Sequence, residues 1–325
     1  MNLQSLFSKK WLLTAVKLLV IVLVAWFVRE TLVKAWRQIG EQTWHWQPFW
    51  LISAGAIYLI GLLPAAAYWH YVLKVLGQDV RWANTLRAYY IGHLGKYVPG
   101  KAMVVILRTG MVRGHRVDTA VAAVSVFFET LTMMAVGAFM AAGILAVRLR
   151  EERMLFWGSI GLMIVSGLPV LPPIFQRLAR LVGIGKSDPA AADALSRLGW
   201  GTLLAGWICM ILVWGLMAAS LWATFRAMGT DIGLVEYAPE LIAAVSLSMV
   251  AGFLSFIPAG LGVRDLVLVE LLTKMFASSG INDATATVAG GLLRLIWLVS
   301  ELIISAILYL WRQQPKPPVY SPGAK

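Results

Sequence analysis

The sequence contains few charged residues and almost no cysteine. Only 14% of the 325 residues are Asp, Glu, Lys or Arg, whereas about a quarter is usual in soluble domains. The single cysteine, Cys209, lies in an apolar run, which excludes disulfides within the chain and cysteine-based metal sites. Hydrophobic residues make up 59% of the chain, and the mean hydropathy is +0.75. This composition predicts an all-α protein that crosses a membrane several times.

Motifs for catalysis and for cofactor binding are also missing. The chain has no Gly-x-Ser-x-Gly elbow, no Walker loop, no His-Glu-x-x-His pair and no dinucleotide fingerprint. Its four histidines are scattered without the spacing of metal ligands. The longest hydrophilic segment, 177–198, is too short for a soluble catalytic domain. We therefore expect a protein that is not an enzyme and that needs no cofactor.

Six apolar stretches are long enough to cross a bilayer as helices, which takes about 20 residues. They lie near residues 11–28, 48–76, 118–147, 155–176, 199–227 and 284–311. The first follows Lys9 and Lys10, but it is long for a signal peptide and precedes no Ala-x-Ala cleavage pattern. We interpret it as a retained membrane anchor.

Two further apolar regions are interrupted by proline and glycine. Pro99 and Gly100 interrupt residues 84–110, and Pro258 interrupts residues 240–278. Proline removes a backbone donor and clashes with the preceding turn, so neither region should form one straight span. Irregular backbone at membrane depth must be buried in protein or line an aqueous cavity. We therefore predict two helical hairpins that enter the membrane and return.

The basic residues predict the orientation of the chain. With the N-terminus in the cytoplasm, the cytoplasmic segments carry 16 Lys and Arg residues and the outer segments carry 6. The outer segment 228–239 is acidic. This asymmetry follows the positive-inside rule and places both termini on the cytoplasmic side of a bacterial-type inner membrane. Loops that face anionic headgroups also explain the net charge of +12, so we expect membrane lipids and no nucleic acid as partners.

The two halves of the chain have matching patterns. Residues 48–147 and 199–311 each contain a span, a broken hairpin and a span with a charge near its middle. The first unit begins outside and the second inside, which makes them candidates for inverted repeats with a binding site between them. The expected fold has six full spans and two re-entrant hairpins, or six to eight segments, in one transmembrane domain (1–312) followed by a short cytoplasmic tail (313–325).

Two charged residues lie near the middle of the predicted spans. Glu129 and Arg294 each follow a helix-starting aspartate, Asp118 or Asp283, by eleven residues, which is about 16 Å at 1.5 Å per residue. Ionisable residues at this depth are costly unless they are paired, so we expect these two to pair with each other. They form either a salt bridge that sets helix register or a polar centre for a passing headgroup. Glu301, on the same helix face as Arg294, favours the second interpretation.

Basic residues surround the first break. Lys96 and Lys101 flank the Pro99-Gly100 turn, where ammonium groups beside free backbone N–H groups would form an anion receptor. A positive cytoplasmic loop is the simpler alternative. Arg108 belongs to the same basic group.

The second break is followed at once by Arg264 and Asp265. A helix that begins here exposes unpaired N–H groups, and Asp265 is placed to cap them. Arg264 has no capping role and is the better candidate for contact with a headgroup.

These motifs resemble those of a known family. The sequence Gly-Lys-Tyr-Val-Pro-Gly-Lys at 95–101, followed by Glu129 in the next span, is similar to the lysylphosphatidylglycerol synthase transmembrane-region family. Residues 258–265 resemble its second signature, with Ala259 where a glycine is usual and Asp265 where glutamate is common. The charges and the resemblance together point to these substrate-binding residues: Lys96, Tyr97, Pro99, Gly100, Lys101, Arg108, Glu129, Arg264, Asp265, Arg294 and Glu301.

The resemblance covers about residues 10–312 and implies a flippase-like membrane domain. The chain ends fourteen residues after Trp311, without the aminoacyl-transfer domain of the family's synthases, so we expect no lysyl transfer. We expect translocation or headgroup binding of an anionic or modified phospholipid or of an isoprenoid-linked lipid. The alternatives are a non-catalytic partner of a lipid-modifying enzyme or glycosyltransferase and, less favoured, an intramembrane transferase, for which no catalytic dyad is evident.

Overall fold

The structure is a computed structural model in which every described element is helical. It describes residues 44–98, 102–113, 117–148, 153–183, 189–255, 260 and 262–311. The first half contains α2 (Pro48–Gly61), α3 (Leu63–Val75), α4 (Trp82–His93), η1 (Leu94–Tyr97), α5 (Ala102–Val112), α6 (Thr119–Arg148) and α7 (Arg153–Gly167). The second half contains η2 (Leu168–Val170), α8 (Pro172–Leu181), α9 (Pro189–Ser196), α10 (Trp200–Ala227), α11 (Ala238–Leu254), α12 (Val263–Met275), η4 (Ala277–Ser279) and α13 (Asp283–Leu310).

Four of the six expected spans are confirmed as helices that are long and apolar enough to cross a membrane. They are Pro48–Val75, Thr119–Arg148, Trp200–Ala227 and Asp283–Leu310. Caps set where two of them begin: Asp118 accepts a hydrogen bond from the Val121 backbone N–H, and Asn282 accepts one from that of Thr285. The expected span at 11–28, like the tail at 313–325, lies outside the described residues.

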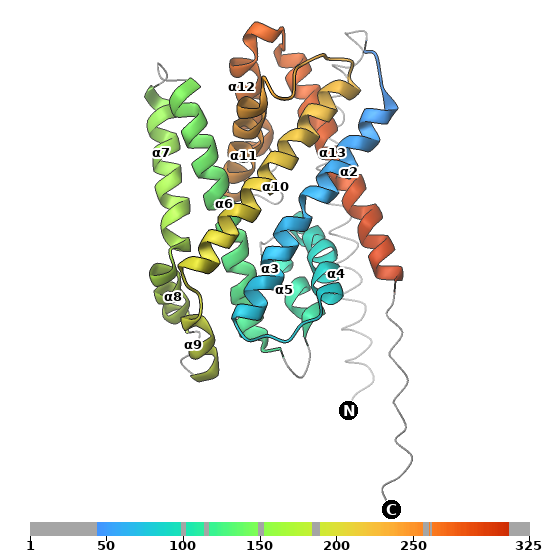
Figure 1. Cartoon of the computed structure of the whole chain (residues 1–325). Coiled ribbons are helices and arrows are strands. Elements are labelled where there is room, and N and C mark those ends of the chain that lie inside the picture. The colour runs from blue at the N-terminus through green and yellow to red at the C-terminus, as the bar shows by residue number, and fades with distance from the viewer. Residues whose placement is uncertain are drawn as a thin grey trace, which may run out of the picture.

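The expected span at 155–176 is not one continuous helix. The helix through α7 and η2 ends at Val170, and α8 continues in a direction bent by 70°. The reason is a cluster of prolines: Pro172 and Pro173 have no backbone N–H to continue the helix, but proline is well suited to the first turn of a new one. Figure 1 shows α8 and α9 turning off at the lower end of α7.

Both broken regions form helical hairpins, as predicted. In the first, η1 ends at Tyr97 and α5 begins at Ala102, and α4 packs against α5. In the second, α11 ends at Leu254 and α12 begins at Val263, and these two helices also pack together. Figure 1 shows the α4–α5 hairpin in the lower half of the bundle and the α11–α12 hairpin in the upper half. This placement is what an inverted repeat requires, although the repeat itself stays a prediction.

Glycine closes each hairpin. A Cβ on Gly95 would lie 2.7 Å from the backbone nitrogen of Val104 in α5. A Cβ on Gly260 would lie 2.7 Å from the Cα of Gly252 in α11, and Gly260 also has a φ of +65°. Both turns therefore bring backbone against backbone, at positions that a larger residue would push apart.

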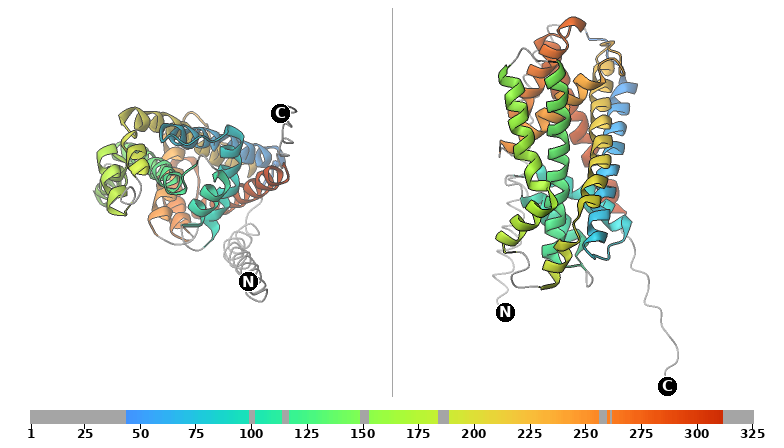
Figure 2. Two further views of the ribbon diagram at one scale, coloured as in Figure 1. Left: turned by 90° about the horizontal axis from the view of Figure 1, so that it is seen from below. Right: turned by 60° about the vertical axis from the view of Figure 1, so that its left-hand side comes forward.

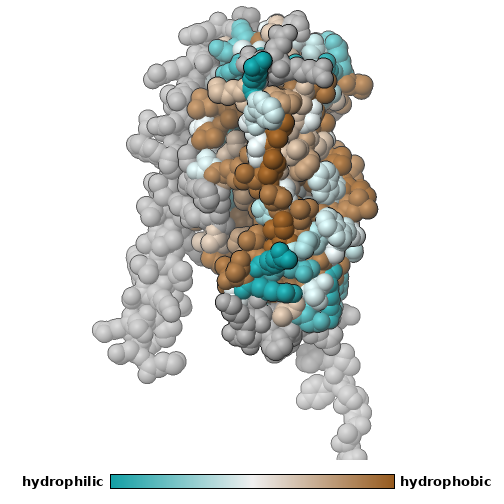
Figure 3. Space-filling view, turned by 90° about the vertical axis from the view of Figure 1, so that its left-hand side faces the viewer, coloured by the Kyte–Doolittle hydropathy of each residue, from teal (hydrophilic) through white to brown (hydrophobic). Residues whose placement is uncertain are grey.

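The four long helices support the hairpins. Helix α10 packs along α2, as the right-hand view of Figure 2 shows, and it also contacts α3, α6 and α13. Trp69, Trp214 and Trp297 are among the largest fully buried side chains of this core. On the face in Figure 3, hydrophobic residues cover the middle and hydrophilic ones gather towards the two ends. Such a band between polar ends suits a protein surrounded by lipid.

Candidate functional site

A cavity of about 220 Å³ lies between the two hairpins. Helices α4 and α5 with η1 supply one wall, α6 a second, and α11, α12 and α13 the rest. Its charged lining residues are Lys96, Arg108, Glu129, Arg264 and Arg294. These five come from five different helical elements, so the fold, and not the local sequence, brings them together.

Glu129 and Arg108 form a buried ion pair in the wall of the cavity. Arg108 Nη1 donates to Glu129 Oε2 over 2.7 Å, and the two side chains are 2% and 1% exposed. The Tyr89 hydroxyl donates to Glu129 Oε1 over 3.0 Å, and the Thr130 hydroxyl donates to Oε2 over 3.2 Å. The Arg108 guanidinium also lies 3.9 Å from the centroid of the Tyr89 ring. The carboxylate is thus fully partnered, which is how a charge is tolerated at this depth.

A second polar group joins the first hairpin to α13. Lys96 Nζ lies 2.5 Å from Glu301 Oε1, and this carboxylate also accepts a hydrogen bond from the Tyr58 hydroxyl. His93 Nε2 lies 3.4 Å from the same hydroxyl and 3.7 Å from Glu301. Glu301 is almost completely buried, whereas Lys96 lines the cavity.

Arg294 pairs across the second hairpin. Its Nη1 donates to Asp265 Oδ2 over 2.8 Å. The same carboxylate accepts a hydrogen bond from the Gly262 backbone N–H at the start of α12, over 3.3 Å. The predicted capping role of Asp265 is therefore confirmed, and Asp265 has a second role as the counter-ion of Arg294.

Arg264 differs from the other cations of the cavity. It is 8% exposed and makes no hydrogen bond or ion pair with any described residue. Its guanidinium lies over the Trp297 ring, 4.7 Å from the centroid, and Trp297 stacks on Tyr58 with centroids 4.3 Å apart. A cation–π contact orients a guanidinium without consuming its N–H donors.

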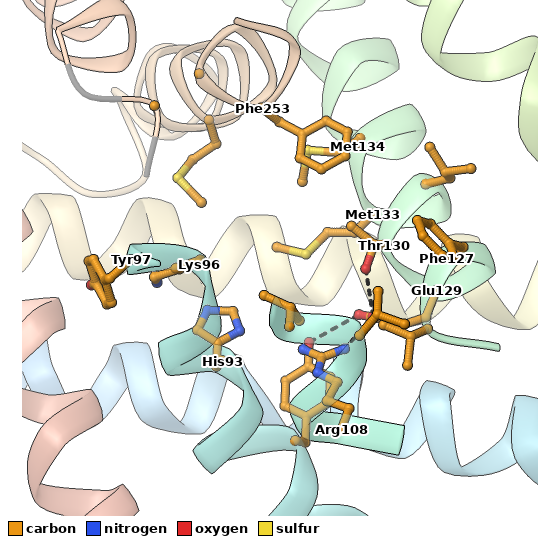
Figure 4. Close-up of a pocket in the computed structure, with 18 of the residues that line it drawn as sticks. His93, Lys96, Tyr97, Arg108, Phe127, Glu129, Thr130, Met133, Met134 and Phe253 are labelled. Carbon is orange, nitrogen blue, oxygen red and sulfur yellow. Dashed lines mark hydrogen bonds and ion pairs between the residues drawn. The ribbon is translucent and has the colours of Figure 1, made fainter. Parts of the chain in front are cut away.

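The remaining wall of the cavity is apolar. It includes Phe127, Met133 and Met134 of α6 and Met249 and Phe253 of α11. Figure 4 shows Phe253 and Met134 across the cavity from Arg108 and His93. Phe127 is about half exposed at the surface of the bundle. Methionine side chains adapt to irregular apolar ligands, so this side of the cavity is suited to hydrocarbon.

The structure brings most of the predicted site residues to this cavity. Six of them line it: Lys96, Tyr97, Arg108, Glu129, Arg264 and Arg294. Asp265 and Glu301 contact lining residues from behind. Pro99, Gly100 and Lys101 lie outside the described residues.

The expected pairing of Glu129 with Arg294 is wrong. Equal depth in the membrane does not make two residues neighbours: α6 meets α5 at Glu129, whereas Arg294 of α13 faces the start of α12. Each hairpin instead supplies the counter-ion for the span beside it. Both residues still face one cavity, as predicted.

Sequence reasoning missed Tyr58, Tyr89 and Trp297. The signal for Trp297 was present, because it lies three residues after Arg294 and four before Glu301, on the same helix face. The tyrosines carried no such signal, since each lies in an ordinary apolar run. In the part of the chain that the structure describes, no three His, Cys, Asp or Glu residues gather as a metal site.

A bundle with four membrane-length helices and a cavity that is charged on one side and apolar on the other is the architecture of a polytopic membrane protein. The model of the family described as the lysylphosphatidylglycerol synthase TM region matches residues 14–305. The chain therefore belongs to this family of membrane domains linked to lipid modification or translocation. No curated protein matches the chain.

Proposed function

We propose that this protein is a flippase-like, non-catalytic membrane protein that binds a lipid headgroup in the cavity and moves it across the bilayer. One observation carries the proposal: a single cavity presents charged groups from both hairpins on one side and methionine and phenylalanine on the other. A headgroup that crosses the membrane must exchange water for fixed polar partners, because lipid tails offer none. The apolar wall meanwhile accommodates the attached chain.

The placement of the hairpins supports movement between two faces. They lie in opposite halves of the bundle, with the cavity between them. Broken helices that meet near the membrane midplane are the common architecture of secondary transporters. We infer that one hairpin controls access from each side.

The test is translocation by the purified full chain in proteoliposomes. A lipid with a fluorescent group on its acyl chain, such as labelled phosphatidylglycerol, is reconstituted, and an impermeant reductant bleaches the outer leaflet. We expect the protected fraction to fall from about one half towards zero. Lipid binding without translocation would instead favour a membrane partner that presents lipid to a lipid-modifying enzyme or glycosyltransferase.

We further propose that the chain lies in the inner membrane with both termini in the cytoplasm. The proposal rests on the basic residues, of which 16 lie in the cytoplasmic segments and 6 in the outer segments of this topology. In a background without Cys209, a cysteine at Asp231 should react with an impermeant thiol reagent added to intact cells. A cysteine at Lys186 should react only after lysis. Labelling of position 186 in intact cells would reverse the topology.

A further inference from the structure

The charges around the cavity do not balance. Within the described residues, the cations are Lys96, Arg108, Arg264 and Arg294. Three of these have a carboxylate partner: Lys96 has Glu301, Arg108 has Glu129 and Arg294 has Asp265. With His93 counted as a neutral imidazole, one positive charge remains, and it is that of Arg264.

An uncompensated guanidinium inside a membrane protein is costly, which indicates that something else completes it. Arg264 is only 8% exposed, and no described residue supplies a hydrogen-bond acceptor to it. Its position is nevertheless fixed. Trp297 holds the guanidinium from one side, and the indole N–H of Trp297 is itself tied to Ser220 Oγ over 2.9 Å. A rigid, open donor group facing a cavity is a preformed anion site.

We infer that the cavity selects a lipid whose headgroup carries one negative charge, a phosphodiester without an amine, and that Arg264 is the residue that binds the phosphate. This inference rests on the proposed function and specifies its substrate class. The planar guanidinium presents two parallel N–H groups to the two non-bridging oxygens of a phosphodiester. One phosphodiester anion also brings the summed charge of the described cavity residues and their carboxylate partners to zero.

The carboxylates exclude an amine-containing headgroup from the same site. Both oxygens of Glu129 already accept hydrogen bonds, and Asp265 binds Arg294 and the Gly262 N–H. Glu301 lies behind the cavity lining and is 1% exposed; its Oε1 holds Lys96 and Tyr58, and its Oε2, which has no hydrogen-bond partner, is buried away from the cavity. Glu129 is the only carboxylate among the described residues that line the cavity, and neither of its oxygens is open to an ammonium group. Phosphatidylethanolamine and lysylphosphatidylglycerol would therefore bring positive charge to a site that has no partner for it.

The inference is tested by calorimetric titration of the full chain in neutral detergent with short-chain lipids. The probes are dioctanoyl phosphatidylglycerol, phosphatidylcholine, phosphatidic acid and lysylphosphatidylglycerol, with inorganic phosphate as the anion without a chain. We expect phosphatidylglycerol to bind roughly 10- to 100-fold more tightly than phosphatidylcholine or lysylphosphatidylglycerol, as one charge-assisted anion site allows. Inorganic phosphate should not compete at comparable concentration, because it lacks the apolar part.

Two substitutions change the charge of the cavity in opposite directions. Arg264→Gln should abolish the preference for phosphatidylglycerol, and Arg264→Lys should restore it in part. Asp265→Asn leaves Arg294 without its counter-ion but keeps an oxygen for the Gly262 N–H, and it should shift the preference towards dianionic phosphatidic acid. Lys274→Gln, which removes an exposed charge from the same helix, is the control and should leave every affinity unchanged.

The outcomes separate the two proposals. If no lipid binds or is translocated, the proposed function fails. If phosphatidylcholine or lysylphosphatidylglycerol binds as tightly as phosphatidylglycerol, or if Arg264→Gln leaves the preference intact, this inference is overturned while the function stands. If inorganic phosphate competes equally, the site binds a free anion and not a lipid.

Discussion

Replacing Glu129 by leucine is expected to lower the free energy of unfolding by about 3–5 kcal/mol, because the change leaves Arg108 as a buried charge without a partner. Arg108→Met should cost a similar amount, because it leaves Glu129 as a buried charge without its counter-ion. The two side chains are 1% and 2% exposed, so water cannot replace the missing partner. Denaturant titration of the purified variants in detergent measures both free energies of unfolding.

The double variant Glu129→Leu/Arg108→Met separates stability from function. Replacing a whole buried ion pair by apolar side chains is often close to neutral, so stability should return to within about 1 kcal/mol of the wild type. Translocation should nevertheless be lost, because the passing headgroup no longer meets these polar groups. A double variant that is stable and fully active would show that the pair only sets helix register.

The control is an ion pair at the surface. Arg197 pairs with Asp193 over 2.7 Å, and the two side chains are 53% and 65% exposed. Water can replace either partner, so Arg197→Gln should cost less than about 1 kcal/mol and leave translocation unchanged.

The sequence predicted the hairpins well because prolines act locally. Pro99 and Pro258 interrupt apolar runs, and no described helix continues through either position. The same rule, applied to Pro172 and Pro173, would have predicted the bend after α7, but the length and apolarity of 155–176 outweighed it.

The sequence could not predict which charged residues pair with each other. Depth along a helix follows from residue count, so it was possible to place Glu129 and Arg294 at a common level. Which neighbour each residue faces depends on helix rotation and packing, and these are set by contacts such as those of Trp297 with Tyr58 and Arg264. The sequence therefore predicted which residues gather at the cavity, but it did not predict which of them form ion pairs.

The pair formed by Lys96 and Glu301 should respond unequally to the loss of either partner. Lys96→Met leaves the Glu301 carboxylate charged at a position that is 1% exposed, with its Oε2 already lacking a hydrogen-bond partner. We expect a loss of about 3–5 kcal/mol in the free energy of unfolding. Glu301→Gln leaves Lys96, which is 22% exposed and lines the cavity, so the ammonium has access to water or to a bound phosphate. This variant should lose only about 1–3 kcal/mol.

The same two variants should have opposite effects on lipid binding. Glu301→Gln adds one uncompensated cation to the cavity, so the affinity for an anionic lipid should rise, and the lipid should restore part of the lost stability by binding only the folded state. Lys96→Met removes a cation, so the affinity for the same lipid should fall. Lys74→Met, which breaks an exposed pair with Asp79, is the matched control and should change neither property. Equal destabilisation by Lys96→Met and Glu301→Gln, with no change in lipid affinity, would mean that this pair joins α13 to the first hairpin and takes no part in binding.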